Sequence, residues 1–464
     1  MTPDGLSEAV EKLRDDGAPE VAIQTFEHYY RRLRSGELGL IPESEIEPVT
    51  DVPDADQLPG PGDGTRDALE QTIVLKLNGG LGTSMGMTGP KSLVEVKDGL
   101  TFLDIAARQV LSLREATGAR LPFVLMNSFY TRDESLAALA RYPEVEADVP
   151  LDFVQGRFPK LRADDLRPVS WPPNPELEWA PPGHGDLYTS IVTSGTLAKL
   201  LERGYRYAIV SNIDNLGAVL DERILAWLAL KRVPFAMEVA ERTEADRKGG
   251  HIARRRAGGR LVLREMAQTP EEDTDAFTAI SRHRFFNTNT LWVDLTTLGH
   301  ALRERDGVLG LPMIVNRKTV DPSDPTSPEV IQIETAMGAA IEVFEGAAAL
   351  RVSRRRFAPV KTTDQLLALR SDAYVLTEGA HVELAPERGE APPVIDLDSR
   401  YYKLIRDFEA RFPHGAPSLV RCDRLTVVGD VLFGAGVVVR GAVRVENPGE
   451  GQLRIEDGTV LEGP

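Results

Sequence analysis

Residues 73–96, IVLKLNGGLGTSMGMTGPKSLVEV, constrain the fold more than any other segment of the 464-residue chain. An apolar run typical of a buried strand leads into a loop with five glycines, which ends at Lys91 before a second apolar run. Glycine lets backbone amides approach a phosphate or a flat base closely and tolerates positive φ. Lysine adds a mobile positive charge for phosphate oxygens. A plain turn between two strands is the alternative, but this combination favours a nucleotide-binding loop.

The two common nucleotide-binding motifs do not fit this loop. A P-loop has glycine directly before its lysine, whereas Pro90 lies between Gly89 and Lys91. The dinucleotide fingerprint requires a small residue three positions after its second glycine, and the residue at that distance from Gly82 is Met85. The sequence therefore predicts a nucleotide cradle of another type.

Strand-like and helix-like patterns alternate from residue 67 to residue 376, which we interpret as the catalytic domain. Strands are predicted at residues 72–77, 123–126, 207–210, 235–239, 261–266 and 290–293, and helices at residues 102–117, 131–142, 187–203 and 221–231. This alternation predicts an α/β fold with a mostly parallel sheet. Ligands of such sheets bind at the carboxyl ends of strands, where the glycine-rich loop and residues 212–215 are expected to lie.

The two flanking regions have their own patterns. Residues 1–66 predict a helical segment, with helices ending near Gly17 and Gly36, followed by a linker rich in Pro, Gly and Asp at residues 48–66. In residues 377–464, apolar residues recur every six positions, in the series Leu425, Val431, Val437, Val443 and the series Val427, Phe433, Val439, Val445. This period, punctuated by glycines, predicts a short β-helix. A meander of short strands is the alternative.

Composition and charge argue against several classes of protein. The single cysteine, Cys422, allows no intrachain disulfide and fits a cytoplasmic, reducing location. The net charge of −17 argues against binding to nucleic acid or an anionic membrane. We expect no signal peptide, and no apolar run reaches the roughly 18 residues that span a bilayer. Glu342 and Glu345 interrupt the most apolar helical stretch, residues 336–352.

The loop sequence LNGGLGTSMG, followed by GPKS, resembles the eukaryotic-type UDP-glucose pyrophosphorylase family, also called UTP–glucose-1-phosphate uridylyltransferases. Seven further segments follow in the family's order: FVQGRFPKL, PPGHGDLY, VSNIDNLGA, FNTNTLWV, IVNRKTVDP, IETAMGAAIEVF and RFAPVKTTDQLL. The match covers most of residues 73–376. The chain departs from the family pattern at Thr290, where Asn is frequent, and at Arg317, where Pro is frequent. We expect these departures to adjust sugar selectivity or loop stiffness, and His251 to lie in a loop that varies across the family.

The resemblance implies a Rossmann-like nucleotidyltransferase sheet of the GT-A type with helices on both faces. It also implies a left-handed β-helix at the carboxyl end, through which a homo-oligomer is possible. The implied reaction transfers a uridylyl group from UTP to glucose 1-phosphate by in-line attack at the α-phosphorus, giving UDP-glucose and pyrophosphate. Because the attacking phosphate is already largely ionised near neutral pH, we expect catalysis to rest on positioning and charge neutralisation.

Matching the family's motifs residue by residue implies the following roles. Lys91 is expected on the UTP phosphates, Lys361 near the phosphates of both substrates, and Asp214 on Mg²⁺, which keeps most of its other ligands as water and phosphate oxygen. Uracil contacts are expected from Leu77, Asn78, Gly79, Gly80, Gln155 and Gly183. Sugar contacts are expected from His184, Asn212 and Asn289, with Glu265 as a weaker candidate, and Ile213 is also expected to contact substrate. The structural alternatives are solvated lysines and, for Asp214, a turn or helix cap.

Three other functions remain as alternatives. A uridylyltransferase for N-acetylhexosamine 1-phosphate or for a broad range of sugars usually has an AGGQGTRLG-type loop, which differs from this one. An inactive sugar-nucleotide-binding regulator is expected to lack Lys91, Asp214 or Lys361, and all three are present. A β-helix acyltransferase is disfavoured because the six-residue repeat is short and terminal.

Overall fold

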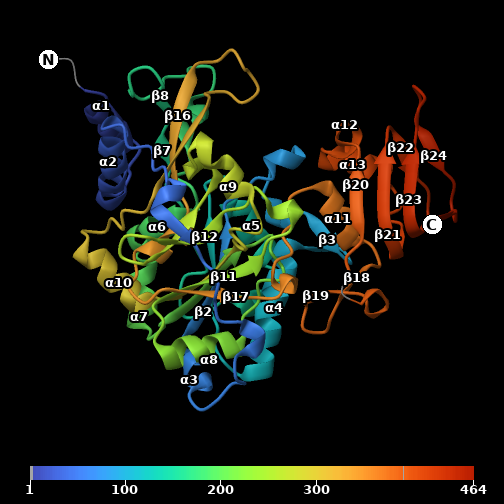
Figure 1. Cartoon of the computed structure of the whole chain (residues 1–464), viewed down its shortest axis with the longest axis horizontal. Helices are drawn as coiled ribbons and strands as arrows, with labels where there is room; N and C mark the ends of the chain where they lie inside the picture. The colour runs from blue at the N-terminus through green and yellow to red at the C-terminus, as the bar shows by residue number, and fades with distance from the viewer. Residues whose placement is uncertain (1–3, 390, 464) are drawn as a thin grey trace.

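The computed structural model describes residues 4–389 and 391–463 of the chain. Figure 1 shows a central sheet surrounded by helices, with the two N-terminal helices at one end and a stack of C-terminal strands at the other. Within the described residues, no helix combines the length and the apolar character that crossing a membrane requires.

Seven strands of the central sheet lie side by side, and only one of these seven runs against the others. Their order is β6 (Asp152–Val154), β5 (Phe123–Asn127), β2 (Thr72–Asn78), β10 (Tyr207–Asn212), β14 (Phe285–Asp294), β11 (Phe235–Glu241) and β17 (Ala348–Arg351). The antiparallel strand is β14, which pairs with both β10 and β11. Three further strands extend the sheet from β14 in antiparallel fashion: β12 (His251–Arg255), β13 (Leu261–Arg264) and β1 (Ile46–Pro48). The predicted α/β fold with a mostly parallel sheet is confirmed.

Alternation of apolar side chains along the strands places helices on both faces of this sheet. In β2, Ile73 and Leu75 join one buried cluster while Val74 joins another, because successive side chains of a strand point to opposite faces. The first cluster includes side chains of α6 (Leu187–Thr193), α7 (Thr196–Glu202) and α10 (Leu295–Glu304). The second includes side chains of α3 (Thr65–Glu70), α4 (Phe102–Thr117) and α8 (Glu222–Lys231).

Most predicted helices are confirmed, and two predictions are wrong. Helix α4 has the predicted bounds, α5 (Arg132–Leu139) is shorter than expected, and α8 begins one residue late. The predicted helix at residues 187–203 is divided into α6 and α7, because Gly195 adopts a left-handed conformation with φ of 73° between them. Residues 336–352 form the short 3-10 helix η11 (Met337–Glu342) and strand β17 instead of a helix. Parallel pairing of β17 with β11 overrides the local helix propensity there.

The N-terminal helices pack on a small sheet beside the main one. Helices α1 (Gly5–Asp15) and α2 (Glu20–Arg34) end where the sequence predicts. Their buried side chains share a cluster with the three-stranded sheet of β15 (Met313–Thr319), β16 (Glu329–Thr335) and β8 (Leu161–Arg162). The strand pair β7 (Phe158–Pro159) and β9 (Trp179–Ala180) adjoins the same cluster.

Helix α9 (Thr274–Thr278) lies beside β12, where Phe277 packs on the ring of His251. The remaining elements lie between the main sheet and the C-terminal strands. They are β3 (Glu95–Lys97), β4 (Leu100–Thr101), α11 (Thr363–Arg370), β18 (Tyr374–Leu376), β19 (Val382–Leu384), α12 (Ser399–Tyr402) and α13 (Ile405–Arg411). In the core, β3, α4 and α11 pack against the C-terminal strands. This shared core includes Val94, Phe102, Leu216 and Val360, so the C-terminal strands share a hydrophobic core with the rest of the chain.

The C-terminal strands form two parallel sets. One set is β20 (Val394–Leu397), β21 (Ser418–Val428), β23 (Val438–Glu446) and β25 (Val460–Glu462), and the other is β22 (Val431–Phe433) and β24 (Leu453–Ile455). All of their pairings are parallel, whereas neighbours in a meander are antiparallel. The eight apolar residues of the six-residue repeat are all buried. The repeat therefore marks a buried apolar column of parallel strands, and the antiparallel meander is excluded for these pairings.

Candidate functional site

The glycine-rich loop leaves the carboxyl end of β2 and returns to it. Two of its five glycines, Gly82 and Gly86, have φ of 63° and 73°, which suits the absence of a side chain. The backbone N–H of Lys91 donates to the carbonyl of Gly80 at 3.0 Å. This hydrogen bond closes the loop and brings the lysine back to the end of the strand.

The loop places Lys91 against Asp214, which lies in the turn after β10. Nζ of Lys91 donates a hydrogen bond to Oδ2 of Asp214, and each side chain is 15% exposed. The contact follows from the sheet, because β2 and β10 are parallel neighbours with Leu77 opposite Asn212. The N–H of Ile213 also donates to the carbonyl of Leu77 at 3.1 Å. The two predicted site segments therefore meet at one edge of the sheet.

A third segment, residues 356–361, joins these two through Asn215. The side-chain Nδ2 of Asn215 donates to the carbonyl of Arg356 at 3.1 Å, and the N–H of Ala358 donates to Oδ1 of Asn215 at 3.0 Å. Lys361 follows with an exposed side chain, and its N–H donates to Oε1 of Gln365 at 2.5 Å. We call residues 356–361 the lysine arm.

Glu265 lies within electrostatic range of the lysine arm. Burial raises the pKa of the Glu265 carboxyl, and the positive charge of Lys361 opposes that rise. A methyl group added at Gly250 would meet the Glu265 carboxyl at 2.5 Å, so the backbone of residue 250 lies directly against it. Of the predicted sugar-binding residues, Glu265 is thus the one whose charge interacts with Lys361.

The residues predicted to bind uracil gather around the start of the glycine-rich loop. Gln155 follows β6, and its side chain lies over Gly79, where an added methyl group would be 3.1 Å from Nε2. The side chain of Asn78 is buried and donates to Asn127 Oδ1 at 2.7 Å and to Ser135 Oγ at 2.8 Å. Asn78 therefore offers a ligand its backbone rather than its amide, as expected for a base held by main-chain groups.

Gly183 and His184 are fixed by residues of β16 and η11. Gly183 has φ of 77°, and a methyl group there would lie 2.4 Å from the carbonyl oxygen of Thr335. The N–H of Met337 donates to Nδ1 of His184 at 3.0 Å. Nδ1 is therefore unprotonated, and burial lowers the pKa of His184 to about 4. At neutral pH the ring is uncharged, with its proton on Nε2 as a donor for a ligand oxygen.

Asn289 has a left-handed backbone with φ of 56°, which is uncommon outside glycine. Two hydrogen bonds of 2.8 Å to Asn287 support it: the N–H of Asn289 donates to Asn287 Oδ1, and Asn287 Nδ2 donates to Asn289 Oδ1. A backbone held in a rare conformation at a predicted sugar-binding residue fits a functional constraint.

A buried polar row crosses the sheet beneath the site, and the sequence analysis missed it. Strand register places Lys76, Ser211, Thr290 and Glu238 side by side on β2, β10, β14 and β11. All four are buried. Arg356 of the lysine arm donates to both carboxylate oxygens of Glu238, at 2.9 and 2.6 Å.

Lys76 joins both ends of the turn that contains Asp214. Its Nζ donates to Ser211 Oγ and to the carbonyl of Ala218, both at 2.8 Å, while burial lowers the pKa of Lys76 to about 7. A lysine inside the apolar run IVLKL was the available sequence signal, because a charged residue seldom occupies a fully buried strand position without partners.

The three residues discussed as departures from the family pattern occupy structural positions. Thr290 is fully buried within the polar row. Arg317 is an exposed residue of β15, within 3.3 Å of Glu329 on β16, rather than a loop residue. His251 begins β12 and stacks on His283 with ring centroids 3.8 Å apart, so its expected placement in a loop is wrong. Pairing of β12 with β13 draws it into the sheet.

The donor set around Asp214 fits an ion that takes few protein ligands. Within residues 4–389 and 391–463, no cluster of three or more His, Cys, Asp or Glu residues is arranged to hold a metal ion. Mg²⁺ is usually bound by one or two carboxylates together with substrate phosphates and water. A single partly exposed carboxylate beside the glycine-rich loop therefore suits Mg²⁺ and does not suit an all-protein cage.

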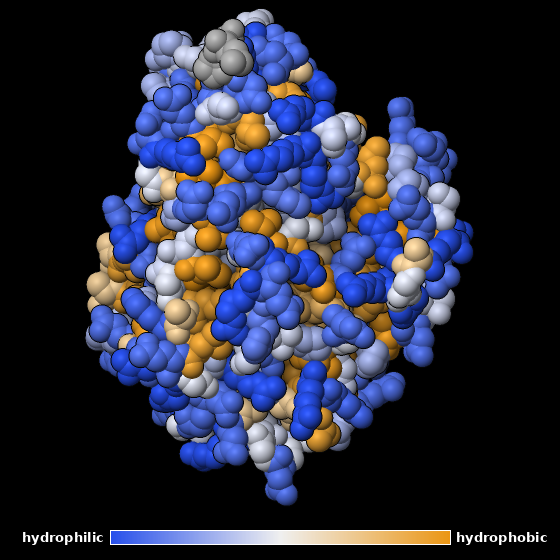
Figure 2. Space-filling model, turned by 90° about the vertical axis from the view of Figure 1, so that its left-hand side faces the viewer, coloured by the Kyte–Doolittle hydropathy of each residue, from blue (hydrophilic) through white to orange (hydrophobic). Residues whose placement is uncertain are grey.

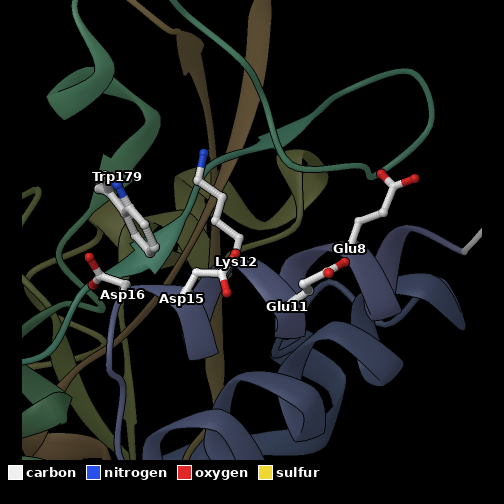
Figure 3. Close-up of a pocket in the computed structure, with 6 residues that line it drawn as sticks. All are labelled: Glu8, Glu11, Lys12, Asp15, Asp16 and Trp179. Atoms are coloured by element: carbon white, nitrogen blue, oxygen red, sulfur yellow. The ribbon is translucent and has the colours of Figure 1, made fainter.

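A hollow of about 440 Å³ lies away from these residues, between α1 and Trp179 (Figure 3). Its remaining lining residues are Glu8, Glu11, Lys12, Asp15 and Asp16. Four carboxylates against one lysine repel a triphosphate. Figure 2, which faces the same end of the molecule, shows mainly hydrophilic side chains with apolar ones between them. We therefore place the candidate site at the carboxyl ends of β2 and β10.

Comparison with known proteins gives consistent matches over nearly the whole chain. A family model described as UTP–glucose-1-phosphate uridylyltransferase matches residues 23–440. A protein of that name from Hordeum vulgare is 40% identical over 465 residues, covering 99% of this chain and 95% of the relative. A probable UTP–glucose-1-phosphate uridylyltransferase from Schizosaccharomyces pombe is 38% identical over 413 residues, covering 89% of this chain and 80% of the relative.

Solved structures agree with this result. A point mutant of UDP-glucose pyrophosphorylase from Leishmania major, crystallised in complex with UDP-glucose, matches with a TM-score of 0.92 and 46% identity, covering 100% of this chain and 99% of that one. UDP-glucose phosphorylase from Trypanosoma brucei matches with a TM-score of 0.90 and 48% identity, covering 99% of this chain and 98% of that one.

Proposed function

The chain belongs to the UTP–glucose-1-phosphate uridylyltransferase family, and we propose that three segments supply the residues that act on the substrate phosphates. These segments are the glycine-rich loop, the turn after β10 and the lysine arm. The protein is a nucleotidyltransferase that converts UTP and glucose 1-phosphate to UDP-glucose and pyrophosphate. The observation that supports this proposal most directly is that all three segments are joined by hydrogen bonds at one edge of the sheet.

In this reaction an oxygen of glucose 1-phosphate attacks the α-phosphorus of UTP, and the bond from that phosphorus to the bridging oxygen of pyrophosphate breaks. The attacking oxygen is already ionised, so no side chain has to remove a proton. Lys361 neutralises charge on the phosphates of both substrates as the new bond forms. At ~4 Å and an effective dielectric constant of ~20, one such charge pair is worth roughly 4 kcal/mol before desolvation.

Lys91 and Asp214 prepare the site for the triphosphate. Asp214 would hold Mg²⁺ through its carboxylate, and the ion would supply positive charge for the UTP phosphates. Lys91 exchanges its carboxylate partner for a phosphate oxygen when UTP is bound. The pairing of Lys91 with Asp214 supports this proposal, because it keeps both charges neutralised while the site awaits its substrates.

The remaining residues orient the two substrates. The backbone of residues 77–80 and the amide of Gln155 hold the uracil edge, and Gly183 leaves room for the ring. His184 donates from Nε2 to a sugar oxygen, and Asn212, Asn289 and Glu265 contact further hydroxyls. Ile213 closes the site between strands β2 and β10. A neutral donor suits a neutral hydroxyl, which is why the low pKa of His184 supports this role.

A comparison of nucleotides and a Mg²⁺ titration test the nucleotide and metal parts of this proposal. Pyrophosphate release with glucose 1-phosphate should be much faster with UTP than with CTP, ATP or GTP, and EDTA should abolish it. Asp214→Asn should raise the Mg²⁺ concentration that gives half the maximal rate, whereas Asp164→Asn, an exposed acid on another part of the surface, should not. An unchanged Mg²⁺ requirement in Asp214→Asn would contradict the assignment.

The C-terminal strands form the second part of the proposal. Their parallel pairing and buried six-residue column support a short β-helix, and the family resemblance favours its left-handed form. Among the residues that the structure describes, strand β25 pairs only with β23, and its Val460 is 47% exposed. Exposed strand edges recruit partners, so this end mediates self-association of the protein. The single cysteine supports a cytoplasmic location.

A further inference from the structure

The side chain of Asn215 connects the turn that contains Asp214 to the arm that contains Lys361. We propose that Asn215 is a positioning residue that fixes the Lys361 ammonium relative to Asp214. This inference rests on the proposed role of Lys361 and concerns how the chain places that charge.

Both ends of the Asn215 amide are used by the lysine arm. Nδ2 donates to the carbonyl of Arg356, and Oδ1 accepts from the N–H of Ala358. A carbonyl can only accept and a backbone N–H can only donate, so these two partners fix the orientation of the amide. Pro359 pairs with Asn215 through the backbone as an isolated antiparallel bridge. The contact therefore behaves like a short stretch of sheet between two loops.

Both connected segments are anchored to the buried polar row. Lys76 holds the turn by its two ends, through Ser211 and Ala218. Arg356 holds the start of the lysine arm through Glu238, and its guanidinium also donates to the carbonyl of Val219 at 2.8 Å. The turn and the lysine arm are thus each anchored to the sheet by buried hydrogen bonds, and the side chain of Asn215 joins them to each other.

Apolar packing also joins the turn to the part of the lysine arm next to Lys361. Leu216, next to Asn215, and Val360, next to Lys361, are both buried in one hydrophobic cluster. The backbone before Lys361 is therefore fixed by a hydrogen bond at Ala358 and by burial at Val360. The Lys361 side chain is exposed, so its position depends on this backbone rather than on packing around its ammonium group.

Asn215 itself is placed to support catalysis indirectly. It is only 2% exposed, and both polar atoms of its amide are bonded to the arm, so the side chain is poorly accessible to a substrate. A reaction that depends on positioning loses about 10²-fold in rate when a group is misplaced by ~1 Å. Loosening the arm should therefore lower kcat while leaving UTP binding in the glycine-rich loop largely intact.

A double-mutant cycle in the full chain tests this dependence on Lys361. We measure kcat and KM for Asn215→Ala, Lys361→Ala and the double variant. Asn215→Ala alone should lower kcat about 10²-fold, with KM for UTP changed by less than about threefold. In the Lys361→Ala background the same substitution should change kcat by less than about threefold. Asn215→Asp keeps the acceptor for Ala358 and should restore part of the lost rate.

Asn447→Ala is the matched control. Asn447 also connects loops through its side chain, by donating to the carbonyls of Asp430 and Gly451, but it lies among the C-terminal strands. Its removal should leave kcat unchanged. If Asn215→Ala fails to fold, the cycle is run with Asn215→Asp and Asn215→Ser, and failure of all three to fold would make Asn215 a folding residue and overturn the proposal.

The possible failures are distinguishable. Equal losses from Asn215→Ala in both backgrounds would mean that Asn215 does not act through Lys361. Normal kcat in a folded Asn215→Ala protein would also overturn the inference. Normal kcat in Lys361→Ala would instead refute the catalytic role of Lys361 on which the inference rests.

Discussion

The Nζ atom of Lys91 donates a hydrogen bond to Oδ2 of Asp214, linking the glycine-rich loop to the turn after β10. The two residues are far apart in the sequence and meet because their strands are parallel neighbours. Under the proposed function, Lys91 would bind a phosphate oxygen and Asp214 would bind a metal ion, and in the structure these two side chains form an ion pair with each other. The proposal therefore requires substrate binding to replace this contact.

Removal of the Lys361 charge should be the most damaging change to catalysis. Lys361→Ala should lower kcat about 10²–10³-fold, the usual cost of losing one donor that stabilises transition-state charge. The fold should survive, because the side chain is exposed. Circular dichroism and the melting temperature check folding, and Lys199→Ala, an exposed lysine of α7, serves as the control. A folded Lys361→Ala protein with nearly normal kcat would refute the assigned role.

Lys91→Ala should impair both binding and rate, unlike Lys361→Ala. It removes the proposed phosphate partner and leaves the Asp214 carboxylate unpaired, so KM for UTP should rise and kcat should fall. Together these changes should lower kcat/KM by about 10- to 10²-fold if one charge-assisted hydrogen bond of roughly 1.5–3 kcal/mol is lost. Steady-state kinetics with UTP as the varied substrate gives both values. A change confined to KM for glucose 1-phosphate would place Lys91 on the other substrate.

His184 should make stability fall as the pH is lowered. The folded state holds its pKa near 4, below the ordinary value of 6.5, so the unfolded chain takes up the proton first. The neutral His184 ring contributes fully to the free energy of unfolding above pH 6.5, and this contribution is lost as the pH falls from 6.5 toward 4. His184→Asn keeps an acceptor for the Met337 N–H and removes the titrating group.

Urea unfolding between pH 4.5 and 7.5 measures this effect. The stability of His184→Asn should fall less steeply with acid than that of the unmodified protein, while other buried groups contribute equally to both and cancel in the difference. His414→Asn, at an exposed histidine, should follow the unmodified protein. Parallel curves for His184→Asn and the unmodified protein would show that His184 is not held neutral by the fold.

Self-association should depend on the outer edge of the C-terminal strands. Truncation near Pro417 should change the mass in solution more than the chemistry per chain, but it also exposes Leu216 and Val360, whose cluster includes the C-terminal strands. A point variant is therefore cleaner. Val460→Glu should reduce the mass toward that of one 50.9 kDa chain, with activity per chain retained. Light scattering measures the mass, and Leu230→Glu, at an exposed leucine of α8, is the control. A protein that is monomeric at every concentration would contradict the proposal.

The sequence predicted the elements of the fold better than their junctions. Apolar periodicity located β2, β10 and α4, because each buries a regular face. It missed the break at Gly195, since the flanking residues continue a helical pattern. It also assigned residues 336–352 to a helix, because only pairing with β11 makes their second half a strand.

The sequence predicted the site residues that lie in recognisable motifs, but it did not predict those that only the strand register brings together. Lys91, Asp214 and Lys361 each stand in a recognisable segment, and the structure brings their segments together. The polar row from Lys76 to Glu238 depends on cross-strand register between four strands that are distant in sequence. No local pattern encodes that register, so Asn215 and Arg356 could be recognised as connecting residues only from the structure.

The substrate panel tests the central claim most directly. Pyrophosphate release is measured with saturating UTP and Mg²⁺ against glucose 1-phosphate, galactose 1-phosphate and N-acetylglucosamine 1-phosphate at matched concentrations. The account predicts the highest kcat/KM for glucose 1-phosphate, together with UDP-glucose formed in equal amount to pyrophosphate. An equal or higher kcat/KM for N-acetylglucosamine 1-phosphate would contradict it.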